Sequence, residues 1–425
     1  MDIAALHKVF LEFNSVCTDT RKVKKNDLFF ALKGANFNGN KFAKQAIEKG
    51  AKYAVVDEEF YNNDTQTILV KNVLETLQKL ATYHRLYLNK PIIALTGSNG
   101  KTTTKELINA VLSTKYKTTA TFGNLNNHIG VPLTLLSMTD DTEIGIIEMG
   151  ANHQKEIDFL CHIAQPDYGY ITNFGKAHLE GFGGVEGVVK GKSEMYDYLI
   201  SHNKHTFVNT EDCIQVEKTK TAKIFTFGPN NNCNVIINFI EANPFVKLNY
   251  ESKYINSQLI GEYNYSNIAV AITIGNYFKI DKNLIIKAIE DYIPNNNRSQ
   301  IIEKGSTKII LDAYNANPTS MEAALLNLEK QKGLKIAILG DMFELGENAE
   351  KEHQAITEQV IRLNINQVIL IGENFYKVNL TSSKLKIFDS YECSEAAIKN
   401  SDFSNATLLI KGSRGMALER LLEIL

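Results

Sequence analysis

Short apolar runs alternate with stretches of helical periodicity along most of the chain. The runs at 91–95, 144–147 and 168–172 are rich in strand-forming residues, which is typical of buried strands. The stretches at 74–86 and 282–292 carry apolar residues at helical spacing and are predicted to be helices. Strands that alternate with helices in this way favour the α/β class with mainly parallel sheets.

Turn-forming clusters divide this pattern at two places. The first cluster, at 89–91, lies between a predicted helix and an apolar strand. The second, at 294–297, reads Pro-Asn-Asn-Asn and precedes a new series of strands. A chain of 425 residues is also too long for one ordinary domain. We therefore expect three domains, at 1–88, 89–294 and 295–425.

The last segment contains a further series of apolar runs, each followed by enough residues for a helix. They lie at 308–311, 335–339, 367–371 and 407–410. This arrangement predicts a small Rossmann-like sheet. In the middle segment, an Asn-rich turn at 230–232 and the alternating residues after it predict an antiparallel excursion.

Charge and cysteine usage narrow the possible partners. The formal net charge is -2, from 46 Lys and Arg against 48 Asp and Glu, so no basic field exists to attract nucleic acid or an anionic membrane. No apolar run approaches the ~18 residues of a membrane span. The five cysteines are scattered without a CxxC pair, which favours a reduced, cytoplasmic protein. We expect small-molecule partners.

The strongest local signal is a glycine-rich turn between an apolar strand and a helix. Its glycines let backbone N–H groups converge on phosphate oxygens, and the helix N-terminus adds positive partial charge. Lys101 would neutralise the β- and γ-phosphates, and the Thr102 hydroxyl would ligate Mg²⁺. The predicted phosphate-binding residues are Thr96, Gly97, Ser98, Asn99, Gly100, Lys101, Thr102 and Thr103.

The spacing of this turn differs from that of the usual P-loop. The first glycine of GxxxxGK[ST] would fall on Leu95, whereas here Gly97 and Gly100 precede Lys101. The sequence also lacks an Asn-Lys-x-Asp guanine signature. Both features disfavour a GTPase-like nucleotide switch.

Two further candidate residues follow predicted strands. Glu148 ends the strand at 144–147, where doubly wound sheets place ligand groups, and it is a candidate Mg²⁺ ligand. His178 lies in a glycine-flanked loop after the strand at 168–172. By itself, His178 is either a metal ligand or an ordinary loop histidine.

Several spaced motifs together resemble the Mur ligase family, from about residue 18 to residue 416. The glycine turn resembles its TGTNGKT loop, and residues 123–134 resemble its GNxNNxIGVPLT loop. Residues 261–267 resemble its GxHNxxN motif, with Tyr263 in place of the usual His. Asn297-Arg298 resembles a Gly-Arg pair at the domain boundary, and residues 312–318 resemble the D-x-YNANP loop.

This resemblance implies a fold and a set of roles. The fold would be the three-domain Mur ligase architecture, with a central P-loop ATPase-like, mainly parallel sheet and a C-terminal Rossmann-like domain. Asn264 and Asn267 would reach the adenine of ATP, Arg298 would approach its phosphates, and Asp312 would contact its ribose. The implied catalytic residues are Lys101, Glu148, His178, Lys192 and Arg298, and the implied ligands of two Mg²⁺ ions are Thr102, Glu148, His178 and Lys192.

Lys192 has a special place in the resemblance. The family's carbamylated lysine falls on Lys192, with Lys190 as a rival in the same turn. An exposed helical lysine is the alternative interpretation.

Substrate binding is implied mainly for the first domain. The segments at 18–21, 27–34 and 37–40 resemble a UDP-muramoyl-binding region, although Asn38 and Asn40 replace a usual Asp and His. An exposed ion pair is the alternative interpretation of Asp19 and Arg21. The implied substrate-binding residues are Asp19, Thr20, Arg21, Lys33, Gly34, Asn126, Asn127, Asn315 and Asn317.

Motifs of the last domain select one activity within the family. Residues 339–346 and 411–416 resemble the members that join D-alanyl-D-alanine to UDP-N-acetylmuramoyl-tripeptide in peptidoglycan synthesis, and the DNPR motif of diaminopimelate-adding members is absent. The implied protein is a monomeric ATP-dependent ligase that works through an acyl phosphate. The alternatives are another amide ligase of the superfamily (MurE-like or folylpolyglutamate synthetase-like), or a non-catalytic partner of cell-wall enzymes that binds nucleotide or UDP-sugar.

Overall fold

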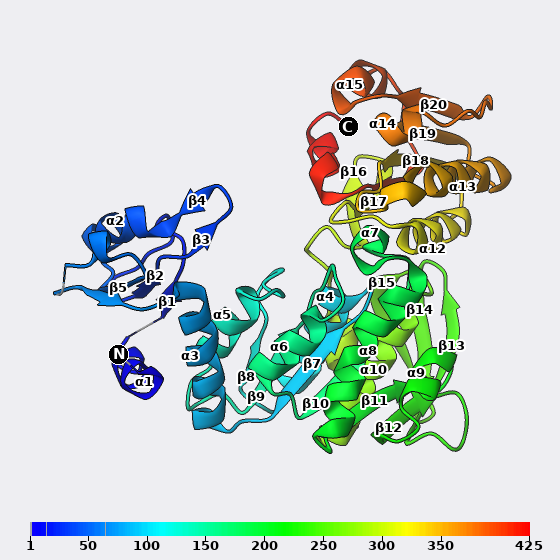
Figure 1. Cartoon of the computed structure of the whole chain (residues 1–425). Helices are drawn as coiled ribbons and strands as arrows, with labels where there is room; N and C mark the ends of the chain where they lie inside the picture. The colour runs from blue at the N-terminus through cyan, green and yellow to red at the C-terminus, as the bar shows by residue number, and fades with distance from the viewer. Residues whose placement is uncertain (1, 14, 64) are drawn as a thin grey trace.

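The computed structural model describes residues 2–13, 15–63 and 65–425 as three α/β domains in sequence (Figure 1). The first contains a four-stranded parallel sheet in the order β1-β2-β5-β6 and a small β3-β4 hairpin. Its strands are β1 (Val16–Cys17), β2 (Leu28–Phe30), β3 (Lys33–Gly34), β4 (Phe37–Asn38), β5 (Tyr53–Val56) and β6 (Thr67–Leu69). Its helices are α1 (Ile3–Phe10), α2 (Ala43–Glu48) and α3 (Val73–Leu88).

Helix α3 connects the first domain to the central one. It begins after Asn72, whose side chain accepts a hydrogen bond from the Glu75 N–H, and it ends at Asn89, which takes the left-handed conformation common at helix ends. Pro91 then prevents further helix. The helix packs against α1 and also against two helices of the central domain, α5 (Gly130–Leu136) and α6 (Glu156–Ala164). The predicted helix at 74–86 is therefore confirmed.

The central domain is built on a nine-stranded sheet in the order β15-β14-β13-β12-β11-β10-β7-β9-β8. Strands β7 to β13 pair in parallel, and β13, β14 and β15 pair antiparallel, which confirms the predicted excursion. The strands are β7 (Ile92–Thr96), β8 (Thr118–Ala120), β9 (Ile144–Glu148), β10 (Tyr168–Ile171), β11 (His205–Asn209), β12 (Lys223–Gly228), β13 (Val235–Ala242), β14 (Phe245–Tyr250) and β15 (Lys253–Ile260).

Helices cover both faces of this sheet because its inner strands are apolar on both faces. In β7, Ile92 and Ala94 belong to one core cluster, whereas Ile93 and Leu95 belong to the other, as expected for the two-residue period of a strand. The helices of the domain are α4 (Lys101–Leu112), α5 (Gly130–Leu136), α6 (Glu156–Ala164), α7 (Leu179–Phe182), α8 (Val185–Ser201), α9 (Cys213–Lys218), α10 (Asn264–Tyr277) and α11 (Lys282–Asp291).

The last domain has a six-stranded sheet in the order β16-β17-β21-β18-β19-β20, parallel except for β16. The four predicted strands correspond to β17, β18, β19 and β21, which confirms the Rossmann-like prediction. The strands are β16 (Gln300–Lys304), β17 (Thr307–Asp312), β18 (Leu334–Gly340), β19 (Gln367–Ile371), β20 (Leu385–Phe388) and β21 (Ala406–Lys411). The helices are α12 (Pro318–Glu329), α13 (Ala349–Arg362), α14 (Glu373–Tyr376) and α15 (Tyr391–Lys399).

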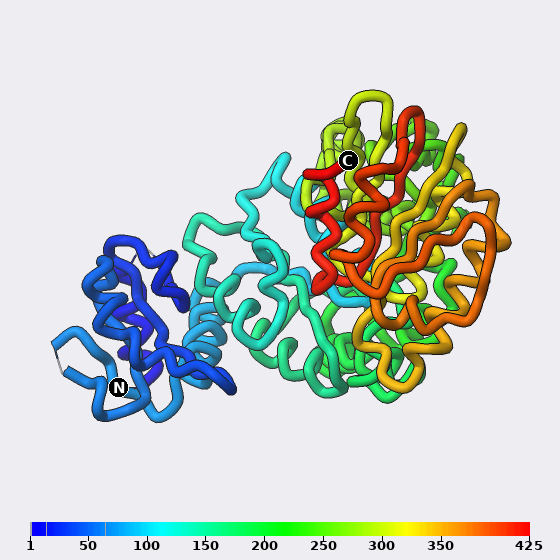
Figure 2. The backbone as a smooth tube through the Cα atoms, turned by 90° about the horizontal axis from the view of Figure 1, so that it is seen from above, coloured from blue at the N-terminus to red at the C-terminus, as the bar shows by residue number. Residues whose placement is uncertain are grey.

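The two outer domains lie on different parts of the central domain. Figures 1 and 2 both show the first domain at one end of the molecule, attached beside α3, and the last domain seated on the central one. The sheets occupy residues 16–69, 92–260 and 300–411. Within the described ranges, we find no helix that is both long and apolar enough to cross a membrane.

Candidate functional site

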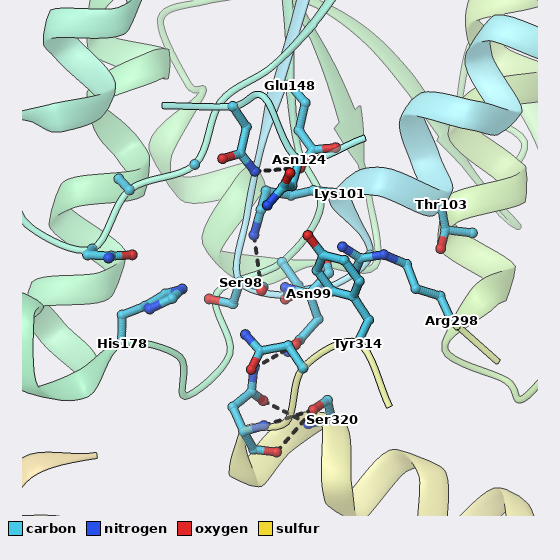
Figure 3. A pocket seen from close by; sticks show the side chains of 18 of the residues that line it. Ser98, Asn99, Lys101, Thr103, Asn124, Glu148, His178, Arg298, Tyr314 and Ser320 are labelled. Atoms are coloured by element: carbon cyan, nitrogen blue, oxygen red, sulfur yellow. Dashed lines mark hydrogen bonds between the residues drawn. The ribbon is translucent and has the colours of Figure 1, made fainter. Parts of the chain in front are cut away.

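A cavity of about 840 Å³ lies where the central and last domains meet (Figure 3). It opens at the carboxyl ends of β7 and β9, beside the first residues of α4. Strand β7 is flanked by β9 on one side and β10 on the other, so the chain changes direction across the sheet at this point. Doubly wound sheets bind ligands at such a switch point.

The glycine turn forms the floor of this cavity and is held rigidly. Gly97 and Gly100 both have positive φ, and a Cβ atom on Gly97 would lie 1.9 Å from the Thr172 hydroxyl. The Ser98 N–H donates to the Asn173 carbonyl at 3.0 Å, and the Thr172 hydroxyl donates to the Asn99 carbonyl at 2.5 Å. The segment after β10 thus fixes the turn before any ligand binds.

Lys101 begins helix α4 and bends back over this turn. Its ammonium donates to the carbonyl oxygens of Gly97 at 2.6 Å and Ser98 at 3.3 Å. The pKa of Lys101 is lowered to about 8, mainly by burial; the charge of Glu148 opposes this shift and that of Arg298 adds to it. A polyanion entering the cavity would meet this cation at the helix N-terminus.

Two buried oxygen atoms near Lys101 make no hydrogen bond. Glu148 uses one carboxylate oxygen to accept a hydrogen bond from the Asn126 amide at 2.8 Å, but its Oε2 has no partner, and neither does the Thr102 hydroxyl. Such buried oxygens fit a hard cation such as Mg²⁺. No group of three or more His, Cys, Asp or Glu side chains within the described ranges is arranged to hold a metal. A Mg²⁺ ion here would therefore need substrate oxygens or water as well.

Lys192 and Lys190 have opposite environments. Lys192 on α8 is fully buried, and its ammonium donates to the Ala151 carbonyl at 3.1 Å and lies 4.9 Å from the centre of the Phe182 ring. Burial lowers its pKa well below the usual value, and the charge of Lys101 adds to the effect. Lys190 is exposed. The interpretation of Lys192 as an exposed helical lysine is therefore wrong, whereas Lys190 is such a lysine.

His178 lines the cavity and contacts the last domain. Its Nδ1 lies 2.5 Å from a carboxylate oxygen of Glu344, and this contact lowers the pKa of Glu344. The other ring nitrogen, Nε2, remains for a ligand. Histidines that bind metals commonly pair their second nitrogen with a carboxylate in this way.

The predicted adenine residues form a small hydrogen-bonded group. The Asn264 amide donates to the Ile260 carbonyl, the Asn267 amide donates to Asn264, and the Thr104 hydroxyl donates to Asn267. These three hydrogen bonds measure 2.8 to 2.9 Å. Both asparagines are buried and line the cavity.

Arg298 and Asp312 enter the cavity from the side of the last domain. The guanidinium of Arg298 stacks on the Tyr314 ring with its central carbon 3.7 Å from the ring centre. Asp312 is the last residue of β17 and accepts a hydrogen bond from the Lys411 ammonium at 2.6 Å. The cationic side chains of Arg298 and Lys411 therefore lie on the side of the cavity opposite the central sheet.

Three consecutive segments of the chain match domains of one family. Residues 12–85 match the Mur ligase family catalytic domain, 95–275 the Mur ligase middle domain and 297–414 the Mur ligase glutamate ligase domain. Over 96% of its length the chain is similar to the UDP-N-acetylmuramoyl-tripeptide–D-alanyl-D-alanine ligase of Bacillus subtilis, with 34% identity and 92% of that protein covered. The chain belongs to the Mur ligase family.

Solved Mur ligase structures share the whole fold. MurF from Acinetobacter baumannii gives a TM-score of 0.88 at 30% identity and covers 99% of this chain, with 97% of its own length matched. MurF ligase from Thermotoga maritima, solved in complex with ADP, gives 0.83 at 25% identity, with 98% and 97% covered. The predicted three-domain Mur ligase architecture is therefore confirmed.

The four asparagines predicted to bind substrate in this Mur ligase also line the cavity. Asn126, Asn127, Asn315 and Asn317 come from loops of the two domains that face each other. Asn127 accepts hydrogen bonds from the N–H groups of the next turn, and Asn317 caps α12 while its amide donates to Asn99 at 2.7 Å. Asn317 therefore links the last domain to the glycine turn.

Other predicted residues lie outside the lining of the Mur ligase cavity. Thr96, Gly97, Thr102 and Lys192 do not line it. Gly97 and Thr102 adjoin lining residues in the sequence, and Lys192 donates to the lining residue Ala151. Asp19 and Arg21 form an exposed ion pair at 2.8 Å, which lowers the pKa of Asp19 to about 2. The predicted residues of the first domain that do not line the cavity are Asp19, Thr20, Arg21, Lys33 and Gly34.

The cavity also contains residues to which the sequence assigned no role. Tyr314, Thr319, Ser320 and Lys411 belong to this group. Lys411 ends β21, next to β17 in the sheet, so the rule that ligand groups gather at the carboxyl ends of parallel strands was enough to find it. Thr319 and Ser320 follow the first residue of α12, and nothing in their local pattern separates them from ordinary helix-start residues.

Proposed function

We propose that this protein joins D-alanyl-D-alanine to UDP-N-acetylmuramoyl-tripeptide with hydrolysis of ATP to ADP and phosphate, a step of peptidoglycan synthesis. The curated relatives in Bacillus subtilis and Escherichia coli carry the name of this ligase and are matched over more than nine-tenths of their length. The observation that carries the proposal is the cavity between two domains, which combines a glycine turn, Lys101, Glu148 and Arg298.

We assign one ligand to each part of the molecule. Residues 1–88 would hold the UDP-muramoyl group, 89–294 would hold ATP, and 295–425 would bind D-alanyl-D-alanine and close on ATP. The predicted substrate residues of the first domain lie outside the cavity, so the extended UDP-tripeptide would have to bridge from that domain to it. An extended nucleotide-peptide suits such a bridge better than a compact substrate.

The chemistry begins at a carboxylate that is a poor acylating agent. One oxygen of the tripeptide carboxylate attacks the γ-phosphorus of ATP, the bond to the β-phosphate oxygen breaks, and ADP leaves. The D-alanyl-D-alanine amine then attacks the acyl carbon, phosphate leaves, and the amine loses a proton. Lys101 and Arg298 would neutralise the anions that must meet. No side chain acts as a nucleophile.

A cation would complete the phosphate site. Thr102 and Glu148 offer unpartnered buried oxygens, and His178 offers its Nε2, so these residues fit the predicted metal site. Mg²⁺ bound there would supply charge neutralisation at the phosphates. The Asn126 amide would keep Glu148 turned toward the cavity through its 2.8 Å hydrogen bond.

We propose further that Lys192 carries a carbamate. The side chain is fully buried beside Ala151, a residue of the cavity wall, and Lys101 lies near enough to influence it. A neutral amine at this place can attack carbon dioxide, which forms a C–N bond and releases one proton. The product is an anion with two oxygen donors, and it would ease the repulsion between two buried ammonium groups.

The compartment and assembly follow from the same proposal. All five cysteines are free, which supports the expected reducing cytoplasm, where ATP is available. The cavity is lined by residues of one chain, so a monomer is sufficient for the reaction.

A mass-resolved assay tests the activity directly. The protein is incubated with ATP, Mg²⁺, several UDP-muramoyl peptides and D-alanyl-D-alanine, and the products are separated by mass. We expect one UDP-muramoyl-pentapeptide and equal amounts of ADP and phosphate. A product formed with diaminopimelate in place of the dipeptide would favour the MurE-like alternative, and nucleotide binding without any product would favour the non-catalytic partner.

A further inference from the structure

A chain of hydrogen bonds crosses the domain boundary along one wall of the cavity. The Tyr263 hydroxyl and the Ser299 hydroxyl lie 2.7 Å apart. The Ser299 N–H donates to Asp312 Oδ1 at 3.2 Å, and the Lys411 ammonium donates to Asp312 Oδ2 at 2.6 Å. Tyr263 belongs to the central domain, Ser299 to the segment that leaves it, and the other two to the last domain. All four residues line the cavity.

Ser299 holds an unusual backbone conformation in this chain. Its φ is +51°, a left-handed value that residues other than glycine and asparagine rarely adopt. Asn297, two residues earlier, is also left-handed, with φ of +56°. The connection between the domains therefore turns sharply here, and surrounding contacts must hold the Ser299 backbone in this conformation. The Tyr263 hydroxyl supplies one of these contacts, and Asp312 supplies another.

Tyr263 is itself held firmly. Gly261 has φ of +82°, and a Cβ atom there would lie 2.3 Å from the Tyr263 ring, so glycine leaves the space that the ring occupies. Burial raises the pKa of Tyr263, and the charge of Asp312 adds to the effect, so the hydroxyl keeps its proton at neutral pH. A Tyr at this place is also the departure of this chain from the GxHNxxN motif.

We infer that Tyr263 is a positioning residue that acts through Ser299 to orient Asp312 toward the sugar of the bound nucleotide. The inference rests on the proposed function, in which Asp312 contacts the ribose. The Ser299 N–H fixes one Asp312 oxygen and Lys411 fixes the other, and the contact of Tyr263 with Ser299 ties the first of these to the central domain. Loss of the Tyr263 hydroxyl would loosen Ser299 and, with it, the hydrogen bond that holds Asp312 Oδ1.

Steady-state kinetics with ATP, 2′-deoxy-ATP and 3′-deoxy-ATP test this inference. In Tyr263→Phe, we expect the KM for ATP to rise roughly threefold to tenfold, the effect of one lost hydrogen bond, with kcat within about twofold of wild type. The preference for ATP over the deoxy nucleotides should fall by a similar factor. Tyr265→Phe is the matched control, because its hydroxyl donates to the Ile237 carbonyl, away from the cavity.

One variant of Ser299 separates the effect of the hydrogen bond from that of backbone strain. Ser299→Gly keeps the left-handed conformation but lacks the hydroxyl, so it should behave like Tyr263→Phe. If Ser299→Gly instead matches wild type, strain alone explains the serine and the inference fails. It also fails if Tyr263→Phe keeps the wild-type preference for ATP over the deoxy nucleotides.

Direct binding keeps this test separate from the proposed activity. Calorimetry with a non-hydrolysable ATP analogue and its 2′-deoxy form measures the same preference without turnover. A wild-type protein that prefers the ribose form but makes no pentapeptide would contradict the proposed function only. Equal loss of affinity for both forms in Tyr263→Phe would contradict the inference only.

Discussion

Lys101 supplies positive charge at the N-terminus of helix α4, beside the glycine turn. Its ammonium donates to two carbonyls of its own turn, contacts that phosphate oxygens would replace. We expect Lys101→Ala to lower kcat/KM by at least about 100-fold, as for loss of a preorganised charge in a closed site, and to leave the fold intact. Initial rates and a circular dichroism melt measure both effects. Lys117→Ala, which changes an exposed lysine directly before β8, is the control, and near-normal turnover in Lys101→Ala would refute the assignment.

Lys192 offers a sharper residue-scale prediction. Lys192→Ala should be nearly inactive and should regain part of its activity with added short-chain carboxylates, whereas the exposed Lys190→Ala should keep most of it. Protein loaded with ¹³C-bicarbonate should give a carbamate signal by ¹³C NMR that Lys192→Ala lacks. Full activity of Lys192→Ala, or the same signal in both proteins, would show that Lys192 is not carbamylated.

Residues inside a contiguous motif were predictable, and residues defined by distant partners were not. The glycine turn requires glycines, a lysine and a hydroxyl in one short run, so its chemistry is visible in the sequence. The contact of His178 with Glu344 joins positions more than 160 residues apart. The stacking of Arg298 on Tyr314 depends on the antiparallel pairing of β16 with β17, and β16 was not predicted from the sequence.

Helices α1 and α3 are joined by two buried histidines. Nε2 of His84 lies 2.9 Å from the Met138 carbonyl, which can only accept, so this nitrogen carries the proton. Nδ1 of neutral His84 therefore accepts from Nε2 of His7 at 3.0 Å. Burial lowers the pKa of both side chains, and the charge of His84 further lowers that of His7. Protonation of His84 would place an N–H group at its Nδ1 directly opposite the N–H group at His7 Nε2.

This pairing predicts that helix α1 loosens in acid. Because both folded-state pKa values lie below the unfolded value of about 6.5, the stability from this pair is complete above that pH and declines as the pH falls below it. Hydrogen exchange of α1, corrected for intrinsic rates, should speed up between about pH 7 and 5. In a His7→Leu, His84→Leu double variant, the exchange rate of α1 should depend less on pH. In the control His153→Gln, which changes an exposed histidine, the pH dependence should match that of wild type. A pH-independent α1 in wild type would contradict the argument.

Strands were predictable where burial on both faces left a continuous apolar run. The four predicted strands of the last domain are nearly all buried and form its parallel core. The edge strands β16 and β20 were missed because they are only partly buried, and their sequences mix polar and apolar residues without a clear period. The antiparallel excursion was visible because buried residues alternate with solvent-facing residues along β14 and β15.

At the scale of the whole molecule, the loop after β10 fastens the last domain to the central one. Lys176 pairs with Glu352 at 2.8 Å, and its N–H donates to the Thr319 hydroxyl at 3.0 Å. His178, from the same loop, contacts Glu344 of the last domain. The last domain is thus already seated over the cavity, while the first domain lies at the far end of the molecule (Figures 1 and 2). The last domain therefore already takes the closed position over the proposed ATP site, and closure of the first domain is the movement that remains.

Ligand binding should therefore change the shape of the molecule in an ordered way. In small-angle scattering, an ATP analogue alone should leave the radius of gyration nearly unchanged, and the further addition of UDP-muramoyl-tripeptide should reduce it as the first domain moves toward the cavity. A Glu344→Gln, Glu352→Gln double variant should be larger than wild type without ligands, because it weakens both fastening contacts. Glu251→Gln, which breaks an ion pair with Lys282 inside the central domain, should have the same radius of gyration as wild type. An unchanged radius with both ligands at saturation would mean that the first domain does not close, and compaction by the ATP analogue alone would mean that the last domain is not seated beforehand.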